Sequence, residues 1–263
     1  MDALTPLQKR EVFHLLFLRE LVRTVPLSAF VLKGGTNLRF FFGSIRYSED
    51  MDLDASGLAV HVLQERVMRV LESSGLADSL RTFGVEELRL PKMVRAKQTE
   101  TVRRFKIGLL SPGGEDLATK VEFSRRGLDE GVRFEPVAAE ILAAYRMPPV
   151  IVPHYGAHSA AMQKVLALFS RALPQARDIF DLYLLSSQPE VLEVALGHGF
   201  APESIRRARD RIFSIGYRQY RDTVVDFLGP EDRAAHDSPS VWDEIRLRVL
   251  DMFEGNVRDG SQA

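Results

Sequence analysis

The sequence predicts an α+β fold: a mixed sheet with flanking helices, followed by an all-α region. Three observations support this prediction. Strand-like and helix-like patterns alternate up to about residue 125, a proline-rich segment covers residues 148–153, and only helical patterns separated by Pro, Gly and Ser follow residue 157. We therefore expect two domains, an α+β domain at residues 1–150 and an all-α domain at residues 151–263.

The first elements are short and alternate in type. Thr5 followed by Pro6 is typical of a helix start, with Thr5 as N-cap and Pro6 at the first helical position, and helical spacing continues to residue 22. The apolar residues 30–32 fit a short strand or a helix end leading into two glycines. The later patterns predict a helix at 36–42, a strand at 51–53 and an amphipathic helix at 60–71.

A hairpin is expected in the middle of the chain. Residues 101–109 and 117–123 alternate in polarity, and the intervening Ser-Pro-Gly-Gly at 111–114 is a turn sequence. Alternation in the second strand puts Lys120, Glu122 and Ser124 on one face and apolar residues on the other.

The second half is predicted to consist of helices at 157–171, 176–186, 189–196, 202–227 and 239–253. The helix at 202–227 is rich in arginine and also contains two tyrosines. Two interpretations remain open for it, a solvated helix face or a patch that binds the RNA backbone, because cationic groups gain affinity by displacing phosphate counterions. The residues concerned are Arg206, Arg207, Arg209, Arg211, Tyr217, Arg218, Tyr220 and Arg221.

Composition excludes several classes of site. The 263 residues contain no cysteine, so disulfides, thiolate metal sites and cysteine catalysis are excluded. The formal net charge of −1 gives no overall electrostatic case for nucleic-acid binding, so such binding would need a local patch. No run of about 18 apolar residues and no signal-like N-terminus is present. We therefore expect a cytoplasmic protein without a membrane partner.

The most informative segment begins with a glycine pair. Gly34 and Gly35 precede the predicted helix at 36–42, and glycines at a helix N-terminus let backbone N–H groups approach an anion closely. Thr36 adds a hydroxyl group that suits phosphate oxygens or a helix cap. A glycine pair alone is equally consistent with a structural turn.

A carboxylate pair follows on the next strand. Asp50 and Asp52 are two residues apart, with apolar Met51 and Leu53 interleaved, so in a strand both carboxylates share one face. Adjacent carboxylates repel unless a cation lies between them, and oxygen ligands suit Mg²⁺ or Mn²⁺. Together with the glycine pair, this pattern favours a site where a divalent metal meets phosphate.

These motifs resemble the AbiEii toxin family, nucleotidyltransferases of the polymerase-β-like superfamily. The matching segments are Lys33-Gly34-Gly35-Thr36 and Arg46-Tyr47-Ser48-Glu49-Asp50-Met51-Asp52-Leu53. Glu122 matches the third carboxylate of the superfamily pattern, and the resemblance extends to Lys164 and to Arg177-Asp178-Ile179-Phe180-Asp181. The resemblance therefore implies a polymerase-β-like fold for the first domain.

The resemblance also implies roles for these residues. Asp50 and Asp52 would hold one metal, and with Glu122 a second, in a two-metal clamp; Glu122 could act as general base instead. The glycines and Thr36 would hold the β,γ-phosphates, and Lys164 would neutralise the triphosphate or pyrophosphate. Either Asp178 or Asp181 would be the functional acid. The other residues of the matched motifs expected at the nucleotide site are Lys33, Arg46, Ser48 and Arg177.

The implied reaction transfers NMP from an NTP to a hydroxyl group. The toxin branch of the family suggests a tRNA 3′ end as acceptor and a cognate antitoxin as partner, within a toxin–antitoxin or abortive-infection system. The alternatives are a protein or small-molecule acceptor, and a non-catalytic nucleotide-binding module.

Four residues keep structural alternatives. Arg46 suits an ion pair with a nearby carboxylate as well as it suits phosphate. Arg177 and Asp178 could form a salt bridge at a helix start. Asp54 lies beyond the motif, and we expect it in a loop or at a helix cap.

Overall fold

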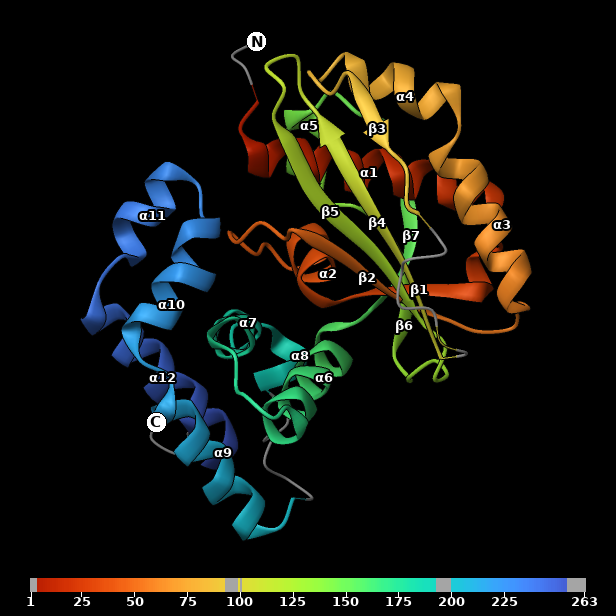
Figure 1. Cartoon of the computed structure of the whole chain (residues 1–263). Coiled ribbons are helices and arrows are strands. Elements are labelled where there is room, and N and C mark those ends of the chain that lie inside the picture. Colours follow the sequence, from red (N-terminus) through yellow and green to blue (C-terminus); the bar gives the residue numbers. More distant parts are fainter. Residues whose placement is uncertain (1–3, 93–98, 100, 193–199, 255–263) are drawn as a thin grey trace. The chain divides into compact units, whose positions relative to one another are not determined.

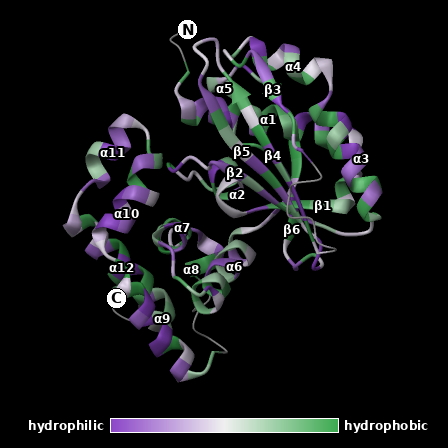
Figure 2. Ribbon diagram, in the orientation of Figure 1, coloured by the Kyte–Doolittle hydropathy of each residue, from purple (hydrophilic) through white to green (hydrophobic). Residues whose placement is uncertain are grey.

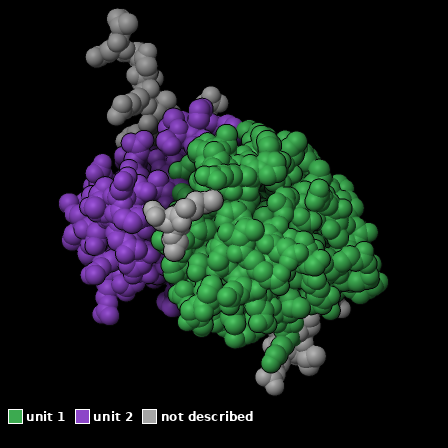
Figure 3. Space-filling view, turned by 90° about the horizontal axis from the view of Figure 1, so that it is seen from above, with its two compact units in different colours: residues 1–43, 47–155 green, residues 44–46, 156–263 purple. Residues whose placement is uncertain are grey.

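A computed structural model describes residues 4–92, 99, 101–192 and 200–254. Within it the chain forms two compact units, residues 1–43 with 47–155, and residues 44–46 with 156–263. The units are coloured separately in Figure 3. That the two parts are independent domains divided near residue 150 stays a prediction. In the described residues no helix is long and apolar enough to cross a membrane.

A seven-stranded mixed sheet organises the first unit, in the order β3-β4-β5-β2-β1-β7-β6 (Figure 1). The expected α+β class is confirmed. The strands are β1 (Phe30–Lys33), β2 (Asp50–Ala55), β3 (Glu87–Arg89), β4 (Val102–Leu110), β5 (Asp116–Ser124), β6 (Val132–Pro136) and β7 (Ile151–Tyr155). The predicted hairpin is β4–β5, and β2 pairs in parallel with β5 and antiparallel with β1.

Helices cover the apolar face of this sheet. Helix α1 (Pro6–Thr24) begins with the predicted cap, in which the Thr5 hydroxyl accepts from Gln8 N and the Gln8 side chain accepts from Thr5 N. It packs against β5, α3 (Val60–Leu71) and α4 (Ser74–Arg81). Alternating residues of β2, β4 and β5, such as Met51, Phe105 and Val121, are fully buried in this core. The polar residues that alternate with these apolar ones along the strands can be followed in Figure 2.

Two further helices of the first unit connect strands. Helix α2 (Gly34–Phe41) follows β1 directly, and α5 (Ala139–Ala144) lies between β6 and β7. The sequence patterns predicted α2 but missed α4, α5, β3, β6 and β7. All of the missed elements are eight residues or shorter, too short to establish a period.

The second unit is helical, as expected. Its helices are α6 (Ala157–Ser170), α7 (Ala176–Leu185), α8 (Pro189–Leu192), α9 (Pro202–Ser214), α10 (Tyr217–Thr223), α11 (Pro230–His236) and α12 (Pro239–Glu254). The final part of the helix expected at 189–196 lies outside the described residues. Trp242 of α12 stacks on Tyr220 of α10 with ring centroids 4.5 Å apart, and both side chains are buried.

The prediction of a single helix at 202–227 is wrong. The chain breaks at Ile215 and Gly216, which are extended, so that α9 and α10 are separate. The indole of Trp242 donates to the Ile215 carbonyl at 3.0 Å, so a tertiary contact satisfies this carbonyl instead of a helical N–H. A glycine in a helix interior costs about 1 kcal/mol relative to alanine, which favours a break at this point.

Candidate active site

The carboxylates predicted from the sequence lie together on the polar face of the sheet. Asp52 of β2 is paired in register with Glu122 of β5, and Asp50 is paired with Lys120. Because residues paired in register point to the same face, Asp50, Asp52, Lys120 and Glu122 form one polar patch. The sequence patterns placed Asp50 and Asp52 on one strand and Lys120 and Glu122 on another, and the parallel β2–β5 pairing brings the two strands together.

Two of the three carboxylates already have cationic partners. Lys120 Nζ is 3.0 Å from Asp50 Oδ2 and 3.9 Å from Glu122 Oε2. The Arg104 guanidinium, opposite Glu122 on β4, lies 2.6 Å from Glu122 Oε2. Among the described residues no group of three His, Cys, Asp or Glu side chains is assembled as a metal site. A three-carboxylate metal centre therefore stays a prediction.

Asp52 is the exception in this patch. Its carboxylate makes no hydrogen bond or ion pair with any described residue. Desolvation raises the pKa of Asp52, and the nearby Glu122 and Asp50 carboxylates raise it further, while Lys120 and Lys33 act in the opposite direction. A divalent cation would offset this desolvation and repulsion. The residues present therefore fit a metal held by Asp52 and its neighbour Asp50.

The glycine pair lies directly beside Asp52. Gly34 begins α2 with a left-handed φ of +71°, and a Cβ at this position would lie 3.1 Å from Asp52 Oδ2. Both the backbone conformation and the close approach therefore require glycine. The first N–H groups of α2, including that of Gly35, have no partner within the helix itself, so this end suits an anion next to the metal carboxylates.

Two hydroxyl groups fix the start of β2. Thr36 Oγ1 donates to the Asp50 carbonyl at 2.9 Å, and Ser48 Oγ donates to the same carbonyl at 2.8 Å. Thr36 is 1% exposed, so its observed contact is with the strand. The phosphate contacts expected of Thr36 and Ser48 stay predictions, and the structure gives both residues a positioning contact.

The expectation that Asp54 lies in a loop or at a cap is wrong. Strand β2 extends to Ala55, so Asp54 is a buried strand residue. Lys33 Nζ donates to its Oδ1 at 2.5 Å and the Tyr155 hydroxyl donates to its Oδ2 at 2.9 Å. Lys33, which was expected to contact the nucleotide, therefore forms an ion pair with a carboxylate of the sheet.

The second unit contains a separate buried ion-pair cluster. Asp181 of α7 is fully buried and accepts from Arg46 Nη2 at 3.1 and 3.2 Å, while Lys164 Nζ of α6 is 2.5 Å from its Oδ2. Burial alone would raise the pKa of Asp181, but Arg46 and Lys164 outweigh it and the pKa is lowered. Of the two alternatives for Arg46, the structure contains the ion pair; phosphate contact stays a prediction.

Asp178 belongs to the same cluster. Lys164 Nζ lies 3.2 Å from its Oδ1, and Arg171 Nη1 lies 2.7 Å from its Oδ2. Burial opposes the charge of Lys164, yet Asp181 and Asp178 together raise its pKa. Arg177 is exposed, and the partners of Asp178 are Lys164 and Arg171, so the Arg177–Asp178 salt bridge is not formed. Functional roles for Lys164, Arg177, Asp178 and Asp181 stay predictions.

Part of the arginine-rich segment is built into the helical unit. Arg211 donates to the carbonyls of Leu168 and Arg171 near the end of α6, and Tyr220 is buried in the helical core. Exposed Arg218 and Arg221 lie near the carboxylates of Asp222 and Asp237. The exposure of most of these arginines fits a solvated helix face, and a patch that binds the RNA backbone stays a prediction.

Sequence reasoning missed the partners that neutralise the carboxylates. Counting outward symmetrically from Gly113 would have placed Arg104 opposite Glu122, as observed. Lys120 was placed on the Glu122 face, but its contact with Asp50 depends on the parallel β2–β5 register. No sequence signal links Arg46 to Asp181, 135 residues away.

Comparison with known proteins gives a family match over most of the chain. The family model described as nucleotidyl transferase AbiEii toxin, type IV TA system, matches residues 16–252. No curated protein matches the chain.

Similar solved structures include two from Helicobacter pylori and one from Mycobacterium tuberculosis. JHP933 from H. pylori has a TM-score of 0.54 and 20% identity, covering 96% of this chain and 92% of that chain. A putative H. pylori nucleotidyltransferase gives 0.54 and 20%, covering 94% and 92%. MenT4, a nucleotidyltransferase toxin of M. tuberculosis, gives 0.54 and 22%, covering 94% and 82%. At these identities the likeness shows the fold, which is that of nucleotidyltransferase structures.

Proposed function

Because the chain belongs to the AbiEii family of nucleotidyltransferase toxins, we propose that it transfers NMP from an NTP to the 3′-hydroxyl of a tRNA. Family membership makes the chain a nucleotidyltransferase toxin of a toxin–antitoxin system, with an NTP substrate and a cognate antitoxin. The acceptor and the metal are the parts proposed.

One observation carries the proposed mechanism. The Asp52 carboxylate has no cationic partner in contact, yet it lies between the Gly34 backbone and Glu122 on a face where the other carboxylates are neutralised. We infer that Asp50 and Asp52 hold Mg²⁺ or Mn²⁺, and that a bound metal would neutralise the triphosphate and favour loss of the hydroxyl proton.

The chain's own residues would position the reactants. The N–H groups at the start of α2 bind the β,γ-phosphates, and Thr36 and Ser48 fix the β2 backbone that carries Asp50. The acceptor oxygen forms a bond to the α-phosphorus, the bond from that phosphorus to pyrophosphate breaks, and the hydroxyl proton leaves. Glu122, oriented by Arg104, is proposed as the third metal ligand or the base that accepts this proton.

An RNA acceptor fits the charges beside this site. Lys120 and Lys106 face each other on β5 and β4, on the same sheet face as Asp50. Cationic side chains next to the reacting hydroxyl suit a polyanionic acceptor better than a neutral small molecule. Protein and small-molecule acceptors, and a non-catalytic module, are the outcomes that a labelling experiment would distinguish.

The test uses each α-³²P-labelled NTP with total RNA or total protein and Mg²⁺. We expect label at RNA 3′ ends with the wild type and at least a 10³-fold loss with Asp52→Ala, because positioning and electrostatics carry this chemistry. Asp78→Ala, which removes an exposed carboxylate on α4, is the matched control and should retain activity. Label in protein alone would refute the RNA acceptor, and equal toxicity and turnover of wild type and Asp52→Ala would favour a non-catalytic module.

A further inference from the structure

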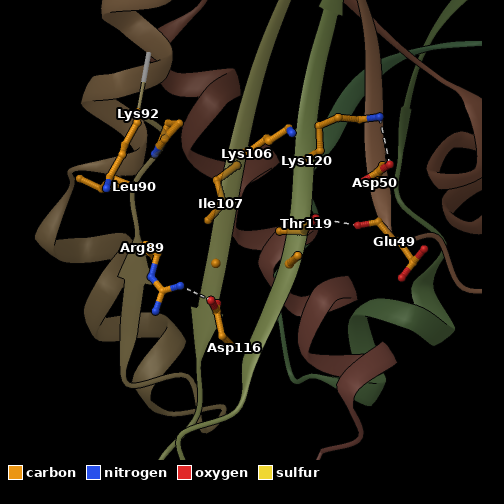
Figure 4. Close-up of a pocket in the computed structure, with 13 residues that line it drawn as sticks. Glu49, Asp50, Arg89, Leu90, Lys92, Lys106, Ile107, Asp116, Thr119 and Lys120 are labelled. Atoms are coloured by element: carbon orange, nitrogen blue, oxygen red, sulfur yellow. Dashed lines mark hydrogen bonds and ion pairs between the residues drawn. The ribbon is translucent and has the colours of Figure 1, made fainter. Parts of the chain in front are cut away.

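A pocket of about 610 Å³ lies next to Asp50 (Figure 4). In the sheet order it lies on the opposite side of β2 from β1 and the glycine pair. It lies over β3, β4 and β5, and its volume is within the usual range for small-ligand sites. The lining residues that matter here are Asp50, Arg89, Lys106, Gly108, Ala118 and Lys120.

Charged side chains of both signs line the pocket. Four are cationic, Arg89, Lys92, Lys106 and Lys120, and three are acidic, Glu49, Asp50 and Asp116. Lys106 and Lys120 are directly opposite each other on antiparallel strands, an arrangement that is destabilising for like charges. Asp50 offsets Lys120 at 3.0 Å, but exposed Lys106 makes no hydrogen bond or ion pair with any described residue. A bound anion would relieve the Lys106–Lys120 repulsion.

Small residues lie next to these lysines. Gly108 and Ala118 are opposite each other in the row beside Lys106 and Lys120. The Arg89–Asp116 ion pair passes over Gly108, and a Cβ there would collide with the Asp116 carboxylate, so this pair fills the space above Gly108. The cations beside Ala118 suit the phosphates of a bound nucleotide.

The sheet order separates this pocket from the nucleotide-binding end. Gly34 follows β1 on one side of β2, while β5, β4 and β3 continue on the other side, so Asp50 and Asp52 lie between the two. In an in-line transfer the attacking oxygen of the acceptor and the leaving pyrophosphate lie on opposite sides of the reacting phosphorus. The pocket therefore occupies the side that the triphosphate leaves open.

We propose that this pocket is the acceptor subsite and holds the last nucleotides of a single-stranded RNA 3′ end, with Lys106 contacting its phosphates. This inference rests on the proposed nucleotidyl transfer and adds the location of the acceptor. Lys106 is a binding residue, and Ala118 lines the pocket beside it.

Fluorescence anisotropy with a 5′-labelled 12-nucleotide single-stranded RNA tests the pocket directly. The measurement uses the whole chain with chelator and without NTP, so binding is read independently of catalysis. Lys106→Gln should weaken binding roughly 3- to 10-fold and lower the salt slope by about 1, because one phosphate contact is lost. Lys106→Arg should bind like the wild type, and Ala118→Glu should weaken binding at least as much as Lys106→Gln.

Arg69→Gln is the matched control. It removes one positive charge from exposed helix α3, where Arg69 pairs with Glu65, and should leave RNA affinity unchanged. In the transfer reaction, Lys106→Gln should raise KM for RNA and leave KM for NTP unchanged.

Two results would overturn the proposal. One is equal RNA affinity for Lys106→Gln and Arg69→Gln, and the other is a rise in KM for NTP in place of KM for RNA. Lys106-dependent RNA binding without transfer to RNA would refute the proposed function and leave the pocket as an RNA site. Transfer to RNA with Lys106-independent binding would refute the pocket alone.

Discussion

The two units contain charged clusters of opposite character. On the sheet face of the first unit, the Asp52 carboxylate has no partner in contact among the residues that the structure describes, and its pKa is raised. In the helical unit, Asp181 is held by Arg46 and Lys164 and its pKa is lowered. Both carboxylates lie among charged groups, so proximity of charge alone does not distinguish them. The difference is whether the cations make direct contact.

This difference is what we would expect between a site that is open to a ligand and a set of ion pairs that is already complete. A buried carboxylate with two cationic partners is already satisfied, and breaking the set is costly. A desolvated carboxylate beside two others is disfavoured in its charged form until a cation binds, and this lowers the stability of the folded protein. The comparison predicts opposite stability effects for the same Asp-to-Asn change.

The largest stability effect is expected from Asp181→Asn. The change leaves Arg46 and Lys164 buried without their shared anion, and we expect a loss of about 3–5 kcal/mol in the free energy of unfolding. Urea unfolding monitored by circular dichroism measures it. The control is Asp222→Asn, which removes an exposed partner of Arg218 and should change stability by less than about 0.5 kcal/mol. Similar losses in the free energy of unfolding for Asp181→Asn and Asp222→Asn would contradict the contrast between the two clusters.

Asp52→Asn is expected to stabilise the metal-free protein by about 1–2 kcal/mol, because it removes a desolvated charge from an incomplete site. Mg²⁺ should raise the Tm of the wild type and have little effect on this variant. Differential scanning fluorimetry with chelator and with Mg²⁺ measures both. A destabilised Asp52→Asn protein that still responds to Mg²⁺ would contradict the assignment.

The pH dependence should differ between the same two variants. The raised pKa of Asp52 means that its destabilising charge is lost as pH falls through that pKa, so the advantage of Asp52→Asn should shrink on acidification from pH 7. The lowered pKa of Asp181 means that its contribution is complete above the ordinary value of 3.8 and is lost only as pH falls through the lower folded value. The free energies of unfolding of the wild type and of both variants, measured in chelator from pH 7 downward, give the stability difference between each variant and the wild type. Parallel pH profiles for the two would count against the assigned shifts.

The smallest effect is expected at the hydroxyl groups that hold Asp50. Thr36→Val removes the hydroxyl and nearly keeps the shape of the side chain, so its difference from the wild type reports the 2.9 Å hydrogen bond to the Asp50 carbonyl. We expect Thr36→Val to be less stable than the wild type by about 1 kcal/mol. Ser48→Ala, at a more exposed position, should cost less than Thr36→Val. The reverse order would show that Ser48 positions the strand.

Much of the first unit could be predicted from local patterns. The capped helix α1, the helix after the glycines, strand β2 and the β4–β5 hairpin each carry their own periodic or turn signal. The patterns failed where the segment was short, as in β7, or where a tertiary contact changed a helix, as at Ile215 and Trp242.

By itself, the sequence determined which residues share a strand face and where glycine is followed by a helix. It thereby placed Asp50 and Asp52 as candidates, because side-chain alternation is a property of the local backbone, whereas Glu122 was added by the family resemblance. Only the tertiary structure decided which charges neutralise one another. The parallel β2–β5 register brings Lys120 to Asp50, and helix packing brings Lys164 and Arg46 to Asp181. Such contacts join residues far apart in the chain, and only packing determines whether a carboxylate is left incomplete for a ligand.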